Sequence, residues 1–322
     1  MRSGPMTSGS GARQTGLIRQ RTRSAWMFVA PMLVVLAIVA LYPLAETIWY
    51  GFTDASLNSI DSARFVGLQN YLEWLDYGDG DGEWLGLLAD ERWWQAVWNT
   101  LRFAFISVSL ETVFGMIIAL VLNKQFAGRS FVRAAVLVPW AIPTVVSAKL
   151  WVWMLHDQFG IINDLMLTLG LISKPIAWTA SPDTAMTAIL IVDIWKTTPF
   201  MALLILAGLQ MIPRDIYEAA RLDQIGPIKL FRKVTLPLVM PAVLVAIVFR
   251  ALDALRVFDV VYIMTPNSDE TRSMSVFARE NLFDYDNFAY GSAASTLLFL
   301  IIALITISFI YGTKMDLSGD KS

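Results

Sequence analysis

Six apolar stretches, each long enough to cross a lipid bilayer as a helix, dominate this sequence. They cover residues 25–50, 97–123, 131–156, 184–211, 237–264 and 290–313. A spanning helix needs about 20 apolar residues, because the hydrocarbon core is about 30 Å thick. Inside that core the backbone must satisfy its own hydrogen bonds, which a helix does within one segment. The sequence therefore predicts an all-α polytopic membrane protein with about six transmembrane helices.

Composition agrees with this prediction. Only 16% of the 322 residues are charged, whereas soluble domains carry about a quarter. The net charge of −2 leaves no basic excess for a nucleic-acid partner. The chain has no cysteine, which excludes disulfides and thiolate metal sites.

Charge alternates between successive loops. The termini (1–24 and 314–322) and the loops 124–133 and 212–236 together hold 15 Lys and Arg. The loops 51–96, 157–183 and 265–289 hold 5, against 17 Asp and Glu. Basic segments stay on the cytoplasmic side. We therefore predict a multi-pass protein of the bacterial cell membrane, with a basic cytoplasmic tail (1–24), a transmembrane domain (25–313) and a second cytoplasmic tail (314–322).

The predicted outer loop 51–96 contains the acidic run Asp79-Gly80-Asp81-Gly82-Glu83. A calcium loop of the EF-hand type needs glycine at its sixth position. Counted from Asp79, that position is Trp84. We predict a solvated acidic loop without a metal site.

Signatures of catalysis are absent from the sequence. It has no GxxxxGK[ST], GxSxG or HExxH motif. Its one histidine, His156, has no evident catalytic partner. The chain is therefore predicted to be neither an enzyme nor an ATP-binding protein, and an intramembrane hydrolase is disfavoured.

The predicted cytoplasmic loop 212–236 carries the most distinctive pattern. Tyr217-Glu218-Ala219-Ala220 predicts a short helix with small residues on one face, and Gly226-Pro227 breaks it. Small side chains allow another protein to approach closely, while the neighbouring charges fix its register. The alternative is an ordinary amphipathic connector, and the residues alone leave both open.

This loop resembles the EAA loop of ABC-importer permeases, through Glu218-Ala219-Ala220, Asp223 and Leu236-Pro237. The resemblance extends from the first predicted helix to the last. Further motifs are similar to those of the carbohydrate branch, the maltose and glycerol-phosphate permeases, and within it to mycobacterial trehalose importers: Val138-Pro139-Trp140-Ala141-Ile142-Pro143, Trp195-Lys196-Thr197-Thr198-Pro199-Phe200, Ala207-Gly208-Leu209-Gln210, Phe258-Asp259 and Tyr290-Gly291-Ser292-Ala293-Ala294.

The resemblance implies a type I ABC-importer permease fold and a set of partners. These are a second permease subunit, two cytoplasmic ATPase subunits that bind the ATP, and an extracytoplasmic binding protein or lipoprotein that delivers a sugar such as trehalose. The implied coupling residues are Tyr217, Glu218, Ala219, Ala220, Asp223 and Gly226. The sequence departs from the family at Gln224, where glycine is usual, and at Thr265-Pro266-Asn267-Ser268. We expect the short helix to continue slightly further because of Gln224.

Ionisable residues within the apolar stretches provide independent indications of a solute path. Asp193 and Lys196 are three residues apart, as are Arg250 and Asp253, so each pair shares a helix face. Such residues either line a wet cavity or form buried ion pairs. We favour the cavity for these four, and a structural role for Asp259. Lys149 and Glu111 are expected to be structural or at the cavity edge.

Hydrogen-bonding groups and aromatic faces suit a sugar, which is neutral and rich in hydroxyls. By the resemblance, the positions that line the substrate path are Asp193, Lys196, Thr197, Phe200, Arg250, Asp253, Ala254 and Val257. The main alternative is a proton-coupled secondary transporter. It would show an internal repeat and no docking loop, and we find no repeat between the two halves.

Overall fold

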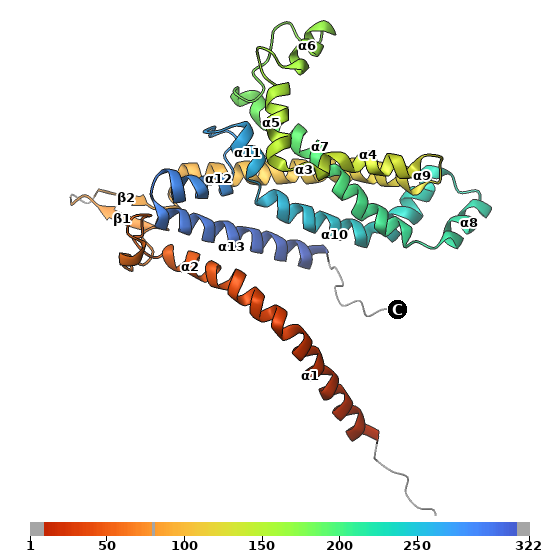
Figure 1. Ribbon diagram of the computed structural model, residues 1–322, viewed down its shortest axis with the longest axis horizontal. Helices are drawn as coiled ribbons and strands as arrows, with labels where there is room; N and C mark the ends of the chain where they lie inside the picture. The colour runs from red at the N-terminus through yellow and green to blue at the C-terminus, as the bar shows by residue number, and fades with distance from the viewer. Residues whose placement is uncertain (1–9, 79–80, 314–322) are drawn as a thin grey trace, which may run out of the picture.

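The structure, a computed structural model, describes residues 10–78 and 81–313 (Figure 1). Within these residues, five continuous helical segments are long and apolar enough to span a membrane: Arg21–Tyr50, Glu91–Asn123, Pro182–Gln210, Pro227–Leu255 and Phe288–Thr313. A bent pair of helices would be a sixth span if the two helices cross the membrane together. The all-α membrane fold with about six spans is therefore confirmed.

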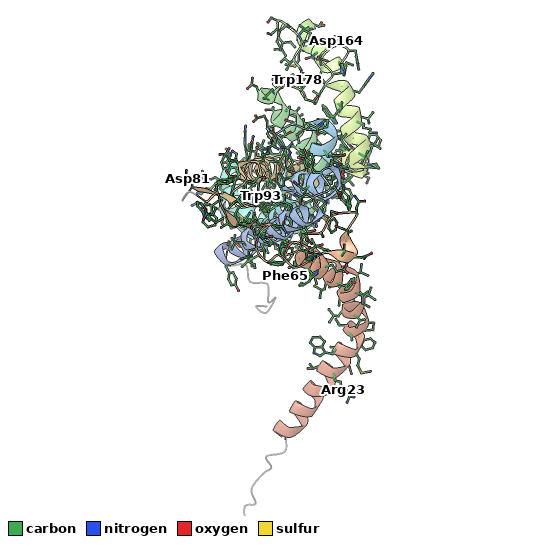
Figure 2. The ribbon with its side chains drawn as sticks, turned by 90° about the vertical axis from the view of Figure 1, so that its left-hand side faces the viewer. Arg23, Phe65, Asp81, Trp93, Asp164 and Trp178 are labelled. Atoms are coloured by element: carbon green, nitrogen blue, oxygen red, sulfur yellow. The ribbon has the colours of Figure 1, made fainter. Side chains whose placement is uncertain are left out.

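The first span consists of three helical segments in one rod, namely α1 (Ser10–Leu36), η1 (Ala37–Leu41) and α2 (Tyr42–Tyr50). Its N-terminal part projects away from the other helices, and Arg23 lies far from the bundle that holds Trp93 (Figure 2). The apolar window of this span is 0% buried. The helix α1 begins at Ser10, ahead of the candidate span, so residues 10–24 of the predicted basic cytoplasmic tail are helical. Residues 1–9 and 314–322 lie outside the described part of the chain.

The loop after the first span folds into more structure than predicted. It contains a short 3-10 helix, η2 (Ile60–Ser62), and an antiparallel hairpin of β1 (Glu73–Asp76) and β2 (Gly82–Leu85). Trp74 faces Trp84 across the hairpin, with ring centroids 5.1 Å apart. Such a cross-strand aromatic pair contributes about 0.2–1 kcal/mol. Residues 79 and 80 of the acidic run lie outside the described residues.

The centre of the bundle is formed by three helices that pack on one another, α3 (Glu91–Asn123), α7 (Pro182–Gln210) and α10 (Leu236–Leu255). Small residues permit their close approach. A Cβ at Gly115 would lie 2.8 Å from Met201 Cγ, and one at Gly208 would collide with Ala242 Cβ. Small residues at such crossings are typical of membrane helices, because packing drives their association there.

The second predicted stretch after the hairpin is broken. It forms α4 (Arg129–Ala141) and α5 (Thr144–Met154), which meet at 88°. Pro143 stands at the break, where its missing N–H and its effect on the preceding residue disfavour a continuous helix. The short helix α6 (Ile161–Thr168) follows, and Asp164 marks its distant position (Figure 2).

The fifth apolar stretch is also divided. α10 ends at Leu255, and α11 (Asp259–Met264) follows as a separate helix, so the predicted continuous span 237–264 is wrong at its C-terminal end. α12 (Met274–Arg279), η4 (Glu280–Asp284) and α13 (Phe288–Thr313) complete the chain. Trp93 and Phe277 pack edge to face at 5.5 Å and join α3 to α12.

The loop between α7 and α10 holds α8 (Arg214–Leu222), α9 (Pro227–Leu230) and the π-helical turn η3 (Phe231–Thr235). α8 and the β1–β2 hairpin lie at opposite ends of the bundle (Figure 1). This arrangement agrees with the prediction that the loops 51–96 and 212–236 face opposite sides of the membrane.

Labelling of single cysteines in this naturally cysteine-free chain is expected to show which end is outside. Asp81 and Lys229 are both exposed. A membrane-impermeant maleimide should label Asp81→Cys in intact cells and Lys229→Cys only after permeabilisation, because basic loops stay inside. The reverse pattern would overturn the predicted orientation.

Candidate functional site

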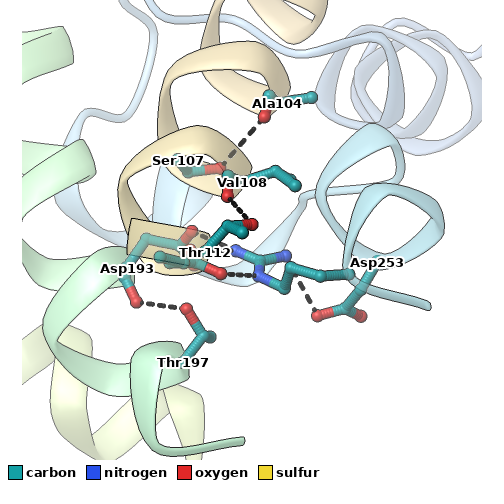
Figure 3. A network of polar contacts seen from close by, with 9 residues as sticks. Ala104, Ser107, Val108, Thr112, Asp193, Thr197 and Asp253 are labelled. Carbon is teal, nitrogen blue, oxygen red and sulfur yellow. Dashed lines mark hydrogen bonds and ion pairs between the residues drawn. The ribbon is translucent and has the colours of Figure 1, made fainter. Parts of the chain in front are cut away.

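A cluster of charged side chains ties the three central helices together (Figure 3). Arg250 on α10 is 2% exposed. Its Nε donates to Glu111 Oε2 at 2.6 Å and its Nη2 to Glu111 Oε1 at 3.0 Å. Nη2 also donates to Asp193 on α7. One guanidinium thus bridges carboxylates from α3 and α7, with the two-pronged geometry that makes Arg–carboxylate pairs strong.

Asp253 completes the cluster in a different environment. Arg250 Nη1 donates to its Oδ2 at 3.3 Å. The Asp253 side chain is nevertheless 60% exposed, whereas that of Glu111 is 0% exposed. Asp253 is therefore the carboxylate of this cluster whose oxygens can accept hydrogen bonds from a molecule outside the packed helices.

Lys196 and Thr197 are placed by hydrogen bonds to backbone. Lys196 Nζ donates to the carbonyl of Trp140 at 3.4 Å, and Thr197 Oγ1 donates to the carbonyl of Asp193 at 2.7 Å. Figure 3 shows Asp193 and Thr197 on successive turns of α7, opposite the α3 turn that carries Thr112. Lys196 forms no ion pair with Asp193 among the described residues.

An aromatic pair lies next to Lys196. The rings of Trp140 and Phe200 are stacked, with centroids 5.7 Å apart and an interplanar angle of 14°. Trp140 is 47% exposed. An exposed indole face held in place by a second ring suits the C–H surface of a sugar, since amphipathic aromatic surfaces are typical of ligand sites.

The last two predicted path residues lie near the end of α10. Ala254 is fully buried and Val257 is half-buried against the core. Ala254 therefore packs inside the bundle and offers no accessible surface in this structure. Val257 accepts a hydrogen bond from Ser273 Oγ through its carbonyl, at 2.7 Å, which anchors the chain after α10.

Six of the eight predicted path residues, all except Ala254 and Val257, lie in one region on α7 and α10. The buried ion pairs that we weighed as the alternative are present, with a difference. Arg250 and Asp253 are paired, but Asp193 pairs with Arg250 on another helix rather than with Lys196. For Asp193 and Arg250 the structure thus favours a structural ion pair over an open cavity. A role in the solute path stays a prediction.

Two residues of this region were not among the predicted path residues. Glu111, which we expected to be structural or at the cavity edge, is a central member of the cluster. A carboxylate in the middle of an apolar stretch needs a partner, and this signal was available. Trp140 was noted only as part of a motif, and the bend after α4 brings its carbonyl to Lys196.

Two further expectations concern isolated groups. Asp259 is exposed at the start of α11, and no ion pair of it is found among the described residues. The structural role expected for it is therefore not supported. Lys149 is exposed on α5.

The predicted docking loop contains the expected short helix. Glu218 and Ala219 are exposed on α8, whereas Ala220 is 6% exposed and packs against the chain itself. Tyr217 is half-buried, and Asp223 and Gly226 follow the helix as exposed residues. Glu218 and Ala219 are therefore accessible to another protein, whereas Ala220 packs within this chain and helps to fix the position of α8.

The end of α8 differs from expectation. We expected Gln224 to let the helix continue, but α8 ends at Leu222 and Gln224 adopts φ +52°. Ile225 N–H then donates to the carbonyl of Ala220 at 3.1 Å. This bond and the left-handed residue before it form a Schellman-type cap, which glycine usually provides. Gln224 thus takes the backbone conformation of the glycine it replaces.

Comparison with known proteins identifies the family. The permease protein MalF of the trehalose/maltose transport system of Thermococcus litoralis is 38% identical over 90% of this chain and 94% of its own. The trehalose transport system permease protein SugA of Mycobacterium tuberculosis is 35% identical over 92% and 91%. The predicted resemblance to this branch is confirmed.

A solved structure supports the fold. A chain of a bacterial ABC transporter that imports the acidic polysaccharide alginate superposes with a TM-score of 0.74, at 19% identity, over 95% of this chain and 100% of that one. Nothing in these comparisons supports a proton-coupled transporter. Residues 111–317 match the family described as the binding-protein-dependent transport system inner membrane component, and this chain belongs to that family.

Proposed function

We propose that this chain is a membrane-spanning permease subunit of an ATP-driven sugar importer, with trehalose or a similar disaccharide as its substrate. The observation that carries the proposal is α8, which presents Glu218 and Ala219 outward from the loop between two spans. ATPase subunits outside the membrane need a rigid contact of this kind to transmit their motion to the spanning helices. Allosteric coupling requires an element whose position both sites can bias.

The assembly would contain a second permease subunit, two cytoplasmic ATPase subunits and an extracytoplasmic binding protein. The first span supports the second permease, because the apolar side chains of α1 between residues 25 and 36 are exposed in the described chain. The chain itself would bind no ATP and catalyse no reaction. Closure of the ATPases would move α8 and turn the bundle between inward-facing and outward-facing states.

The substrate class is supported by Asp253, Lys196 and the Trp140–Phe200 pair. An exposed carboxylate accepts from hydroxyls, an ammonium donates to them, and the stacked rings offer an apolar face. The test is uptake of labelled trehalose by cells that carry this chain with its partner genes, compared with cells that lack it. Competition by unlabelled maltose would show a shared disaccharide site. Absence of uptake of either sugar, with ATPase subunits bound, would refute the disaccharide assignment.

Substitutions on the exposed face of α8 are expected to uncouple transport. Ala219→Leu adds bulk where a partner must approach, and Glu218→Lys reverses a charge that fixes its register. Both side chains are exposed, so folding and membrane insertion should stay normal while the ATPase is lost on purification or hydrolyses ATP without uptake. Sugar uptake and ATPase co-purification are measured together.

The matched control is Lys229→Gln, which lies on α9 in the same loop, is also exposed and is not among the predicted coupling residues. It should change coupling less than either substitution within α8, since it adds no bulk and reverses no charge. If Ala219→Leu and Glu218→Lys both transport normally with the ATPase bound, α8 is only a connector.

A further inference from the structure

A cavity of about 1170 Å³ lies beside α8, at the end of the bundle opposite the β1–β2 hairpin. The ends of α3, α4 and α7 and the segment from α8 to η3 form its walls. Its volume exceeds the 300–1,000 Å³ that is typical of small-molecule sites. The predicted solute path, which runs past Asp193 and Arg250, does not include any residue of this lining.

The cavity is rich in positive charge. Lys124, Arg129, Arg133 and Arg214 line it, and Glu218 is its only acidic lining residue. None of these four basic side chains forms an ion pair with any residue that the structure describes. The lining therefore carries an excess of positive charge that the chain itself does not neutralise.

Two of these guanidinium groups have buried nitrogens without partners. The Nε atoms of Arg129 and Arg133 are inaccessible to solvent and donate to no acceptor. Arg133 makes one long hydrogen bond, from Nη2 to the carbonyl of Leu122 at 3.4 Å. A buried donor without an acceptor is costly, and most so when it is charged. An anion in the cavity would lower this cost, because its charge would lie close to both guanidinium groups.

Apolar residues also line the cavity, beside the polar side chains of Asn123, Gln125, Gln210 and Thr235. Leu120 and Leu209 come from spanning helices, and Leu230 and Phe231 from the turn that leads into α10. A cavity with arginines at one wall and leucines at another suits an amphipathic anion better than free phosphate. Basic pockets between helices at the cytoplasmic surface are suited to anionic lipid head groups.

We propose that this cavity binds an anionic phospholipid, whose phosphate is held by Arg129 and Arg133 and whose acyl chain lies against Leu209 and Phe231. Arginine suits this role because its planar fork matches phosphate oxygens in pairs. Tyr217 and Glu218 of α8 also line the cavity, so the bound lipid would lie directly beneath that helix. The lipid site does not depend on the proposed function of α8.

The test uses the full chain, purified with the subunits that accompany it and depleted of lipid in detergent. Fluorescent phosphatidylglycerol and phosphatidylcholine are titrated in mixed micelles, and bound lipid is measured. We expect at least tenfold tighter binding of phosphatidylglycerol. The double variant Arg129→Gln/Arg133→Gln should lose at least about tenfold of that affinity, because it removes both charged donor groups.

The matched control is Arg232→Gln/Lys233→Gln. It removes the same charge from the same loop, at exposed positions that do not line the cavity. It should keep phosphatidylglycerol affinity within about twofold, since it leaves the phosphate ligands intact. The variant Arg129→Lys/Arg133→Lys keeps the charge and should retain the lipid preference, which separates loss of binding from loss of fold.

Four results would overturn the proposal. The first is equal affinity for the two lipids, and the second is an equal loss in the control and cavity variants. The third is displacement of phosphatidylglycerol by millimolar inorganic phosphate, which would assign the site to a free anion. Exclusion of the lipid when an ATPase subunit is bound would instead assign the cavity to acidic side chains of that partner, and would also refute the lipid site in the assembled importer.

Discussion

Replacing Arg250 with methionine is expected to prevent the chain from accumulating as a stable protein. Arg250 is buried and is the cation that neutralises both Glu111 and Asp193. Methionine fills similar space but leaves two carboxylates in the interior. Removing one partner of a buried ion pair costs about 3–5 kcal/mol, which is a large part of the stability of a domain. Yield and thermal midpoint of the purified protein are the measurements.

The control for this variant is Arg256→Met. Arg256 lies at the end of the same helix, its side chain is 68% exposed, and its ion pair with Asp253 is long at 3.9 Å. Such exposed pairs contribute about 0–1 kcal/mol, so yield should not change. A second test adds Glu111→Gln and Asp193→Asn to Arg250→Met, which should recover stability because no buried charge remains. Normal yield of Arg250→Met alone would show that the cluster is not a structural lock.

Replacing Asp253 with asparagine is expected to reduce sugar uptake at least about tenfold without lowering protein yield. A charge-assisted hydrogen bond contributes about 1.5–3 kcal/mol, and 1.4 kcal/mol is a factor of ten. Arg250 keeps its two other carboxylates, so no buried charge loses its partner. Uptake and yield are measured in the same cells.

Asp259→Asn is the matched control for Asp253, because it neutralises another exposed carboxylate on the next helix. It should transport at the normal rate. Unchanged uptake by Asp253→Asn would remove Asp253 from the solute path. Asp193→Asn belongs with Arg250 instead, since its side chain is only 11% exposed and a loss of yield is expected there.

The positions of the spans could be predicted because the physical requirement is simple. Length and apolarity decide whether a helix can cross a bilayer, and five continuous candidate spans and one bent helix pair are found near the predicted stretches. Their ends were less predictable. Residues 256–258 interrupt the fifth stretch although Val257 and Phe258 are apolar, because hydropathy does not distinguish a helix from an apolar turn.

The candidate site could be predicted in part. Charges inside apolar stretches pointed to Asp193, Lys196, Arg250 and Asp253, since ionisable residues at that depth are rarely accidental. Their pairing could not be deduced, because spacing along one helix suggests partners only on that helix. The bond from Arg250 to Glu111 joins residues 139 positions apart, and only the packing of α3 on α10 creates it.

Local backbone conformation was the least predictable feature. Glutamine at 224 gave reason to extend α8, yet the chain turns there with the conformation of glycine. The cap that Ile225 makes to Ala220 offsets part of the cost of the left-handed residue, which is about 1–2 kcal/mol. The β1–β2 hairpin escaped prediction because its strands have only four residues each.

The right-angled break between α4 and α5 has a consequence for how a solute could pass. The last carbonyls of a helix have no partner within it, and the one at Trp140 already accepts from Lys196. Neighbouring carbonyls at the end of α4 are then uncharged acceptors, suited to hydroxyl groups. Passage is fast when several weak sites replace one strong site. The broken helix would thus lower the free-energy barriers between successive binding positions along the predicted path. We therefore expect substitutions at the break to alter the turnover rate more than the apparent affinity for the sugar. Initial uptake rates over a range of sugar concentrations would measure both.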